Sequence, residues 1–352
     1  MSLLVIMPTL FLGGAETQFR MLFEKMKEQT DKVYILSLKE SPKTFIAEDF
    51  KERNKKNIIE LNFKSNIIVK LIAIVLCIIY FRVKGLRNIL VYETYWLIPL
   101  PLMKLLSYRV LYSERNSGYH RISFMYHLIK RCDFVCTNSI ESQKVLIKKT
   151  GRNDIKVINN GVIIPEKTTI INNTEKSEQN TFKIVVPARV CHVKNQLFVI
   201  NALYDVDNIE VHFAGKISEN DYYEKMLKKI NELKVNDKFF FDGFCENWIE
   251  TYKDFDLVLL PSLEEGTSNV ILESFANKRP ILVSDIEMNT RLEHNDDFVF
   301  SLEKVNSLKD AVRRIKDMPQ KKINDHLQDN YDFVKREYSV DVMAKTYISK
   351  LK

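Results

Sequence analysis

Two carboxylates lie eight positions apart in the stretch EEGTSNVILES, residues 264–274. Glu265 follows the apolar run LVLLPS and stands in a short polar turn. Glu273 stands among apolar side chains in a stretch of helical period. The pattern predicts a strand, a loop and a helix, and so places Glu265 at the carboxyl edge of a parallel sheet, where doubly wound folds bind ligands.

The start of that helix could bind an anion. Thr267 or Ser268 can cap it. The free N–H groups from Gly266 to Val270, together with the helix dipole, would attract a phosphate. Glu273 lies about one turn further on, where its carboxylate could accept two hydrogen bonds from a diol such as ribose. The other interpretation is a glutamate on the exposed face of an amphipathic helix, and the spacing alone does not decide between them.

Two cations are expected at the same edge of the sheet. Arg189 and Lys194 lie in PARVCHVKNQ, at and after the end of the apolar run FKIVVPA. Cations here could stabilise the charge that grows on a departing phosphate. Ordinary solvated surface charges are the alternative.

Two glycines follow the first apolar run. Gly13 and Gly14 lack β-carbons, so the chain there could approach a phosphate or a sugar closely. The sequence contains no G-x-G-x-x-G, which argues against a dinucleotide-dependent oxidoreductase.

The elements that must position these residues are short apolar runs that alternate with segments of helical period. Because the runs are continuously apolar, both faces of each strand are expected to be covered, as in parallel sheets. The alternation predicts an α/β protein of two Rossmann-like doubly wound domains facing each other across a cleft. The runs are LLVIMP, KVYILSL, NILVYET, YRVLYSE, DFVCTNS and IKVINNG in the first half, and FKIVVPA, IEVHFAG, KFFFDG, LVLLPS, PILVSD and DFVFSL in the second.

The predicted domains are residues 1–165 and 178–338. Between them, the polar segment PEKTTIINNTEKSEQNT, residues 165–181, has the composition of a linker. The last stretch is helical in period and is split near REYSVD. A terminal helix, residues 339–352, is expected to cross back onto the first domain.

Composition favours a cytoplasmic globular protein. The 352 residues suggest about two domains. The start lacks the basic region of a signal peptide, and the five cysteines include no C-x-x-C pair, which favours reduced thiols over a disulfide framework or a zinc site. Residues 1–165 carry a net charge of +12, whereas residues 166–352 carry −5. The basic half predicts an anionic partner, although a solvated surface would explain it equally.

Five motifs in order resemble the retaining GT-B glycosyltransferases of family four. Glu265 and Glu273 match the E-x7-E signature of that family, and PARVCHVKNQ is similar to its G-R-L-x-x-x-K-N segment. GGAE after the first strand, INNGV near the end of the first domain and FAGK after a strand of the second domain resemble three further pieces. The resemblance covers nearly the whole chain and favours the ligand-binding interpretation of both acids.

The resemblance implies a role for each matched residue. Arg189 and Lys194 would contact the donor diphosphate, Glu265 the hydroxyls of the donor sugar, and Glu273 the ribose. Many relatives carry a histidine near the end of a first-domain strand. Arg115, in LYSERNSGYH, takes that place here and is a further predicted catalytic residue, with His120 five residues on. The other predicted donor-binding residues are Gly13, Gly14, Gly243, Phe244, Gly266, Thr267, Ser268, Asn269 and Val270. Phe244 and the nearby Trp248 could equally be packing residues.

Retention of the anomeric configuration is implied by the family, through front-face displacement in which the departing phosphate takes the acceptor proton. No protein nucleophile is needed for that route. Two D-x-D tripeptides occur, at residues 205–207 and 254–256. We assign both to structure and predict neither a metal requirement nor a cofactor.

Residues 66–87 contain an apolar run with basic flanks, shorter than the roughly 20 residues that a membrane span requires. One interpretation is a helix packed on the first sheet. The other is that this helix, with residues 95–106, rests on an anionic membrane, peripherally on the inner face of the plasma membrane, and reaches a lipid-linked acceptor.

The sequence thus predicts a glycosyltransferase of cell-surface polysaccharide synthesis, with residues 1–165 binding the acceptor and residues 178–338 the nucleotide sugar. A UDP-sugar is the favoured donor, and a saccharide or a lipid-linked sugar the acceptor. The alternatives are a non-catalytic nucleotide-sugar binding subunit, a UDP-sugar 2-epimerase or a sugar phosphorylase. A nucleic-acid binder is disfavoured, because no motif of that class occurs.

Overall fold

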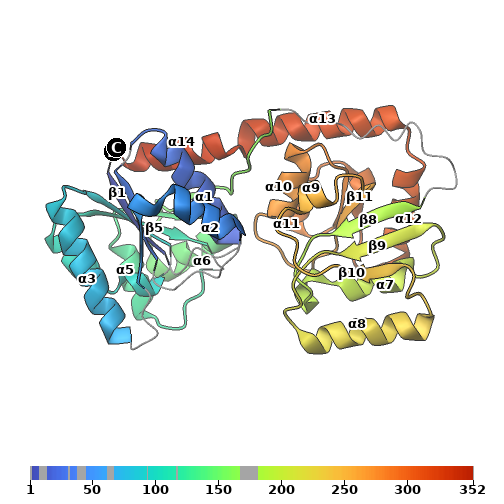
Figure 1. Cartoon of the computed structure of the whole chain (residues 1–352), viewed down its shortest axis with the longest axis horizontal. Coiled ribbons are helices and arrows are strands. Elements are labelled where there is room, and N and C mark those ends of the chain that lie inside the picture. The colour runs from blue at the N-terminus through green and yellow to red at the C-terminus, as the bar shows by residue number, and fades with distance from the viewer. Residues whose placement is uncertain are drawn as a thin grey trace. The chain divides into compact units, whose positions relative to one another are not determined.

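The computed structural model describes residues 2–7, 14–30, 32–37, 45–61, 67–92, 94–115, 118–166 and 181–351, shown in Figure 1. They form two compact units. Unit 1 comprises residues 1–161 and 339–352, and unit 2 comprises residues 162–338. Most of the predicted linker, residues 167–180, lies outside the described residues, as does Gly13.

Within the described residues, unit 1 is built on a seven-stranded sheet whose strand pairs are all parallel, in the order β3-β2-β1-β4-β5-β6-β7. Most of its strands are apolar and buried along their length, because helices cover both faces of the sheet. The strands are β1 Leu3–Met7, β2 Val33–Ser37, β3 Ile58–Glu60, β4 Asn88–Val91, β5 Arg109–Glu114, β6 Phe134–Thr137 and β7 Lys156–Val157.

The helices of unit 1 divide between the two faces of this sheet. Side chains of α1, α2 and α14 share one apolar core with the sheet, and those of α3, α4, α5 and α6 share the other. The terminal helix α14 packs against α1, which brings the end of the chain onto unit 1 (Figure 1). The helices are α1 Gly14–Lys27, α2 Phe45–Arg53, α3 Ile67–Val83, α4 Leu100–Leu105, α5 Phe124–Lys130, α6 Ile140–Thr150 and α14 Val340–Leu351, with 3-10 turns η1 Lys55–Asn57 and η2 Thr94–Leu97.

In the part of unit 2 that the structure describes, a six-stranded parallel sheet has the order β10-β9-β8-β11-β12-β13. Helices α7, α8 and α12 cover one face, and α10 and α13 cover the other. The strands are β8 Phe182–Val186, β9 Ile209–Phe213, β10 Phe239–Phe241, β11 Leu257–Leu260, β12 Ile281–Ser284 and β13 Val299–Phe300. The helices are α7 Gln196–Leu203, α8 Asn220–Leu233, α9 Trp248–Thr251, α10 Asn269–Ala276, α11 Glu287–Thr290, α12 Val305–Lys316 and α13 Gln320–Glu337, with 3-10 turns η3 His192–Lys194 and η4 Asp296–Phe298.

The strand order of unit 2 reverses between β8 and β11. From β8 the chain continues through β9 and β10 to one side, and it then returns to place β11 on the other side of β8. The connections after β8 and after β11 therefore leave the same edge in opposite directions. Such a switch point is where open α/β sheets bind their ligands.

Each of the twelve apolar runs forms a strand, so the predicted α/β class is confirmed. β3 was not predicted, because its three residues at the margin of the sheet give too short a pattern. The predicted break near REYSVD is also confirmed: α13 ends at Glu337 and α14 begins at Val340.

Candidate active site

The loop after β11 and the turn after β8 meet through an ion pair at the switch point of unit 2. The Lys194 ammonium lies 2.5 Å from Oε1 of Glu265. Both side chains are largely shielded from solvent, with 18% of Lys194 and 10% of Glu265 exposed. The sequence predicted both residues at this edge of the sheet, and the structure brings their charges into direct contact.

Backbone contacts fix the position of this pair. The N–H of Leu263 donates to the carbonyl of Val193 at 2.8 Å, which ties the acid-bearing loop to η3. The hydroxyl of Ser262 donates to Glu265 Oε1 at 2.7 Å, while the Ser262 carbonyl accepts from Ser284 at the end of β12. Glu265 is thus held in place from β8, β11 and β12 before any ligand binds.

Helix α10 begins directly after this loop, with Ser268 in the N-cap position as expected. The Ser268 side chain makes no capping hydrogen bond, so it satisfies none of the first-turn N–H groups of α10. A β-carbon placed on Gly266 would meet nothing within 4 Å. The helix start and the glycine before it therefore leave room for an anion such as a phosphate.

Glu273 lies one turn into α10. Its Oε2 accepts a hydrogen bond of 2.7 Å from the indole N–H of Trp248, at the start of α9. Burial raises the pKa of the Glu273 carboxyl, and the bond from Trp248 lowers it in part. A carboxylate kept in an apolar setting needs hydrogen-bond donors, and hydroxyl groups of a ligand would supply them.

Two exposed side chains lie at the same edge of the sheet. Arg189 follows β8, and among the described residues the structure gives its guanidinium no hydrogen bond or ion pair. Phe244 follows β10 with 56% of its surface exposed, just after Gly243, whose φ of +73° suits glycine. A free cation and an exposed ring at a ligand-binding edge are suited to a phosphate and a nucleobase.

The backbones after β8 and β9 approach each other closely. A β-carbon on Gly215 would lie 1.9 Å from the carbonyl oxygen of Ala188. Only glycine therefore fits at the FAGK motif, and its function is to let the loop that carries Arg189 sit against β9.

One carboxylate of each D-x-D tripeptide has a protein partner. Asp256 is buried and accepts from the N–H of Lys183 at 2.8 Å, and Asp205 pairs with Lys309 at 2.5 Å. Among the described residues, no cluster of His, Cys, Asp and Glu side chains is arranged to hold a metal ion. These contacts assign structural roles to Asp256 and Asp205.

In unit 1, Arg115 follows β5 and forms a hydrogen bond to the terminal helix α14. Its guanidinium donates to Asn160 Oδ1 at 3.0 Å and to the Tyr347 hydroxyl of α14 at 2.8 Å. The same group lies over the rings of Tyr92 and Tyr347. The geometry gives this arginine a structural role, and its predicted catalytic role stays a prediction.

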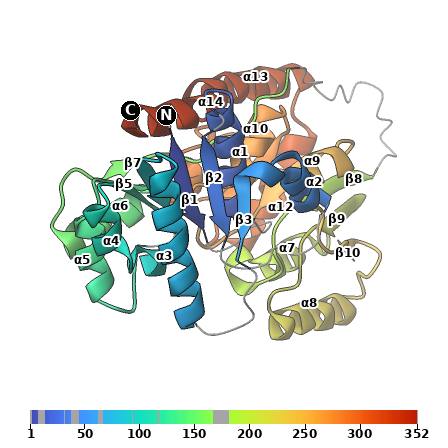
Figure 2. The ribbon, with the colours of Figure 1, turned by 60° about the vertical axis from the view of Figure 1, so that its left-hand side comes forward.

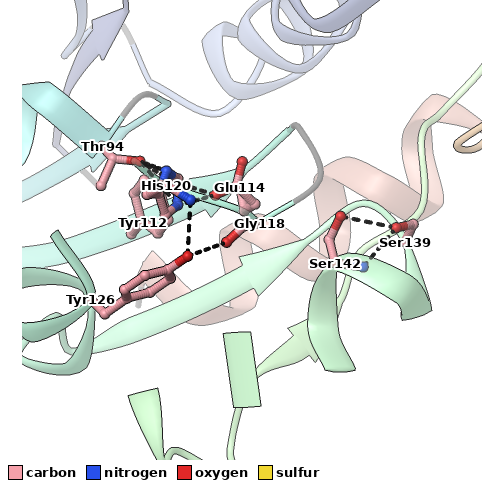
Figure 3. A network of polar contacts seen from close by, with 8 residues as sticks. All are labelled: Thr94, Tyr112, Glu114, Gly118, His120, Tyr126, Ser139 and Ser142. Atoms are coloured by element: carbon pink, nitrogen blue, oxygen red, sulfur yellow. Dashed lines mark hydrogen bonds and ion pairs between the residues drawn. The ribbon is translucent and has the colours of Figure 1, made fainter. Parts of the chain in front are cut away.

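A second polar network at the end of β5 was not predicted (Figure 3). Glu114 is 1% exposed, accepts from the Tyr112 hydroxyl at 2.8 Å and lies 2.8 Å from His120 Nε2. The hydroxyl of Thr94 contacts the ring of His120, and the backbone N–H of His120 donates to the hydroxyl of Tyr126. A glutamate at the end of an otherwise apolar strand was the available sequence signal for this buried carboxylate.

The structure therefore brings Lys194, Glu265, Gly266 and Ser268 together at one place in unit 2. Four further predicted residues lie at the same edge. Arg189 follows β8, Gly243 and Phe244 follow β10, and Glu273 lies on α10. Gly14 opens α1 in unit 1. Sequence reasoning missed Ser262 and left Trp248 undecided between packing and binding, because neither belongs to a motif.

Comparison with known proteins gives one family match. Residues 167–331 match the sequence model of the family Glycosyl transferases group 1. The matched segment covers most of unit 2, including the Lys194–Glu265 pair and α10.

The curated proteins similar to this chain include two glycosyltransferases. The capsular polysaccharide biosynthesis glycosyltransferase CapH of Staphylococcus aureus is 30% identical over 175 residues, 48% of this chain and 46% of that protein. The UDP-Gal:alpha-D-GlcNAc-diphosphoundecaprenol alpha-1,3-galactosyltransferase of Escherichia coli is 26% identical over 233 residues, 61% of this chain and 59% of that protein. The aligned regions thus span about half the length of these relatives.

The crystal structure of HepE from Anabaena, in complex with UDP and glucose, superposes with a TM-score of 0.81 at 17% identity. The superposition covers 100% of this chain and 99% of that one. Since the similarity extends over both units, it identifies the fold of the whole chain.

Proposed function

We propose that this protein is a retaining glycosyltransferase of cell-surface polysaccharide synthesis, because residues 167–331 match the model of the family Glycosyl transferases group 1 and the whole chain has the GT-B fold. The donor is a UDP-sugar, and the acceptor is a saccharide or a lipid-linked sugar. The reaction takes place on the cytoplasmic side and requires no metal. The observation that carries the proposal is the Lys194–Glu265 pair at the switch point, beside the start of α10, where the Ser268 side chain makes no capping hydrogen bond.

The chemistry follows from the charges at this edge. In the free protein Lys194 is neutralised by Glu265. A diphosphate at the start of α10 would offer Lys194 a new anionic partner, and the exposed Arg189 would supply the second cation. Glu265 would then be released to accept hydrogen bonds from the donor sugar. The partner exchange keeps the site close to electrically balanced before and after binding.

In the transfer step, the bond between the anomeric carbon and the phosphate oxygen breaks and a bond to the acceptor oxygen forms on the same face. The acceptor proton passes to the departing diphosphate. Lys194, Arg189 and the amides of α10 stabilise the charge on that leaving group. Glu273 binds the ribose, while Gly243 and Phe244 contact the base.

UDP is the favoured nucleotide for two reasons. The E. coli relative is named for a UDP-sugar donor, and HepE was crystallised with UDP. The lipid-linked acceptor in the name of the E. coli relative supports an acceptor of that class.

A panel of UDP-, GDP- and ADP-sugars tests the proposal by thermal shift. We expect UDP-sugars alone to raise the unfolding midpoint of the wild type, and we expect Lys194→Ala and Glu273→Ala to abolish that rise. Slow hydrolysis of the matched donor, unchanged by EDTA, would distinguish an enzyme without a metal requirement from a non-catalytic binding subunit. A shift that persists in both variants would show that the nucleotide binds elsewhere and would overturn the proposed site.

A further inference from the structure

Helix α3 of unit 1 is apolar on two sides. Ile74, Ile78 and Phe81 are buried against the first sheet. The opposite side carries five apolar side chains, spaced alternately three and four residues apart, which places them on one face of the helix. Between 39% and 83% of each is exposed, and together we call them the α3 stripe: Val69, Ile72, Leu76, Ile79 and Val83.

Such a stripe is unusual for a solvated helix, which normally carries polar residues opposite its buried face. The helix lies at the periphery of unit 1 (Figure 1), and its length is visible in the turned view of Figure 2. An exposed apolar stripe along the length of one helix marks a contact site.

Basic side chains border the carboxyl end of the stripe. Lys84 follows Val83 directly, and its ammonium lies 5.6 Å from the centre of the Tyr80 ring. Arg87 and Arg109 are exposed at the amino ends of β4 and β5, joined by a backbone hydrogen bond of 2.8 Å. Residues 61–92 contain five basic residues and no acidic residue. Positive charge therefore lies beside the apolar stripe. The nearby carboxylate of Asp133, which accepts from the N–H of Val110 next to Arg109, is paired with Lys104.

We propose that the α3 stripe lies in the interface of an anionic lipid bilayer, with Lys84, Arg87 and Arg109 on the headgroup phosphates. An amphipathic surface binds a membrane by burying its apolar side among the acyl chains while cations contact anionic headgroups. α3 has 17 residues, and within the described residues no helix combines the length and apolar character needed to cross a membrane. Its buried face stays in the core of unit 1, so the helix lies along the surface.

A second copy of the chain fits this surface less well. Parallel pairing of two α3 helices would place Lys84 of one copy near Lys84 of the other, and antiparallel pairing would offer Lys84 no carboxylate, because α3 carries no acid. Anionic headgroups would supply the missing charge.

Co-sedimentation with vesicles tests the inference without any donor sugar, so its outcome is independent of the proposed reaction. We compare vesicles of phosphatidylcholine alone with vesicles containing about 30% phosphatidylglycerol, at low and high salt. The wild type should bind the anionic vesicles and be released by salt. The double variants Ile72→Ser/Leu76→Ser and Lys84→Glu/Arg87→Glu should each lower the partition coefficient about tenfold or more.

Matched variants control for general effects of polarity and charge. Val305→Ser/Val342→Ser removes two valines of 43% and 39% exposure on α12 and α14, and Lys225→Glu/Lys228→Glu reverses two exposed charges on α8. Both controls should partition like the wild type, and all variants should keep its unfolding midpoint. Equal binding by the wild type and the stripe variant would overturn the inference. So would a wild-type dimer, detected by light scattering, that dissociates in Ile72→Ser/Leu76→Ser.

Discussion

Each unit places a cation at the carboxyl edge of its parallel sheet, and the two cations have different partners. In unit 2, Lys194 pairs with a carboxylate across the switch point. In unit 1, Arg115 contacts only neutral groups in the bonds described above, an amide oxygen and a phenol of the terminal helix. Lys194 can exchange Glu265 for an anionic ligand at little electrostatic cost. Arg115 cannot exchange its partners in this way without releasing α14.

The two units share one type of fold, but Lys194 of unit 2 is suited to binding a ligand, whereas Arg115 of unit 1 holds the terminal helix in place. Phosphate could replace Glu265 because both are anions that accept hydrogen bonds from an ammonium. Tyr347, by contrast, is fully buried, and burial raises the pKa of its phenol well above the ordinary value, so it stays neutral. Identical charge at similar places in two sheets therefore does not imply identical function.

Replacement of Lys194 should have the largest effect on activity. In Lys194→Ala the leaving diphosphate loses its cation, and we expect the transfer rate to fall about 10²–10³-fold. The free energy of unfolding should also fall, by about 1–3 kcal/mol, because the largely shielded Glu265 carboxylate loses its cation. Steady-state kinetics with the matched donor and chemical denaturation measure the two effects.

Lys183→Ala is the matched control for that experiment. Lys183 forms an ion pair with Glu210 near the start of β8, away from the carboxyl edge. Its replacement should leave the transfer rate unchanged. Equal losses in both variants would show that the Lys194–Glu265 pair has no special part in the reaction.

Replacement of Arg115 should instead affect stability. Arg115→Ala removes the guanidinium that donates to Asn160 and Tyr347, and we expect a loss of about 2–3 kcal/mol in the free energy of unfolding. Tyr347→Phe should cost less, and the double variant should cost less than the sum of the two, because both changes break the same bond. Hydrogen exchange should show faster opening of α14. A variant of full stability and no transferase activity would restore the catalytic interpretation of Arg115.

The sequence predicted the backbone of this protein better than its side-chain contacts. Continuous apolar runs predicted the strands, and the start of α10 was predicted to within one residue, after Thr267 or Ser268, because both signals are local. The bond from Arg115 to Tyr347 joins residues 232 positions apart, and the bond from Trp248 to Glu273 joins α9 to α10. Contacts of this kind depend on how helices pack on the sheets, and no spacing in the sequence records that.

Glu273 offers the smallest and most specific test of the difference between the two edges. Since its pKa in the folded protein is raised above the ordinary value of 4.5 by burial, its ionisation costs stability above the folded pKa, and the cost disappears as the pH falls below 4.5. Glu273→Gln keeps an acceptor for Trp248 and removes the charge. We expect it to be more stable than the wild type at neutral pH and equal to it in acid. Urea denaturation at several pH values measures this difference, and the variant should bind a UDP-sugar more weakly. A gain in stability together with loss of binding would show that the carboxylate is kept at this edge for a ligand, whereas a loss of stability at neutral pH would assign it to the structure, like Arg115.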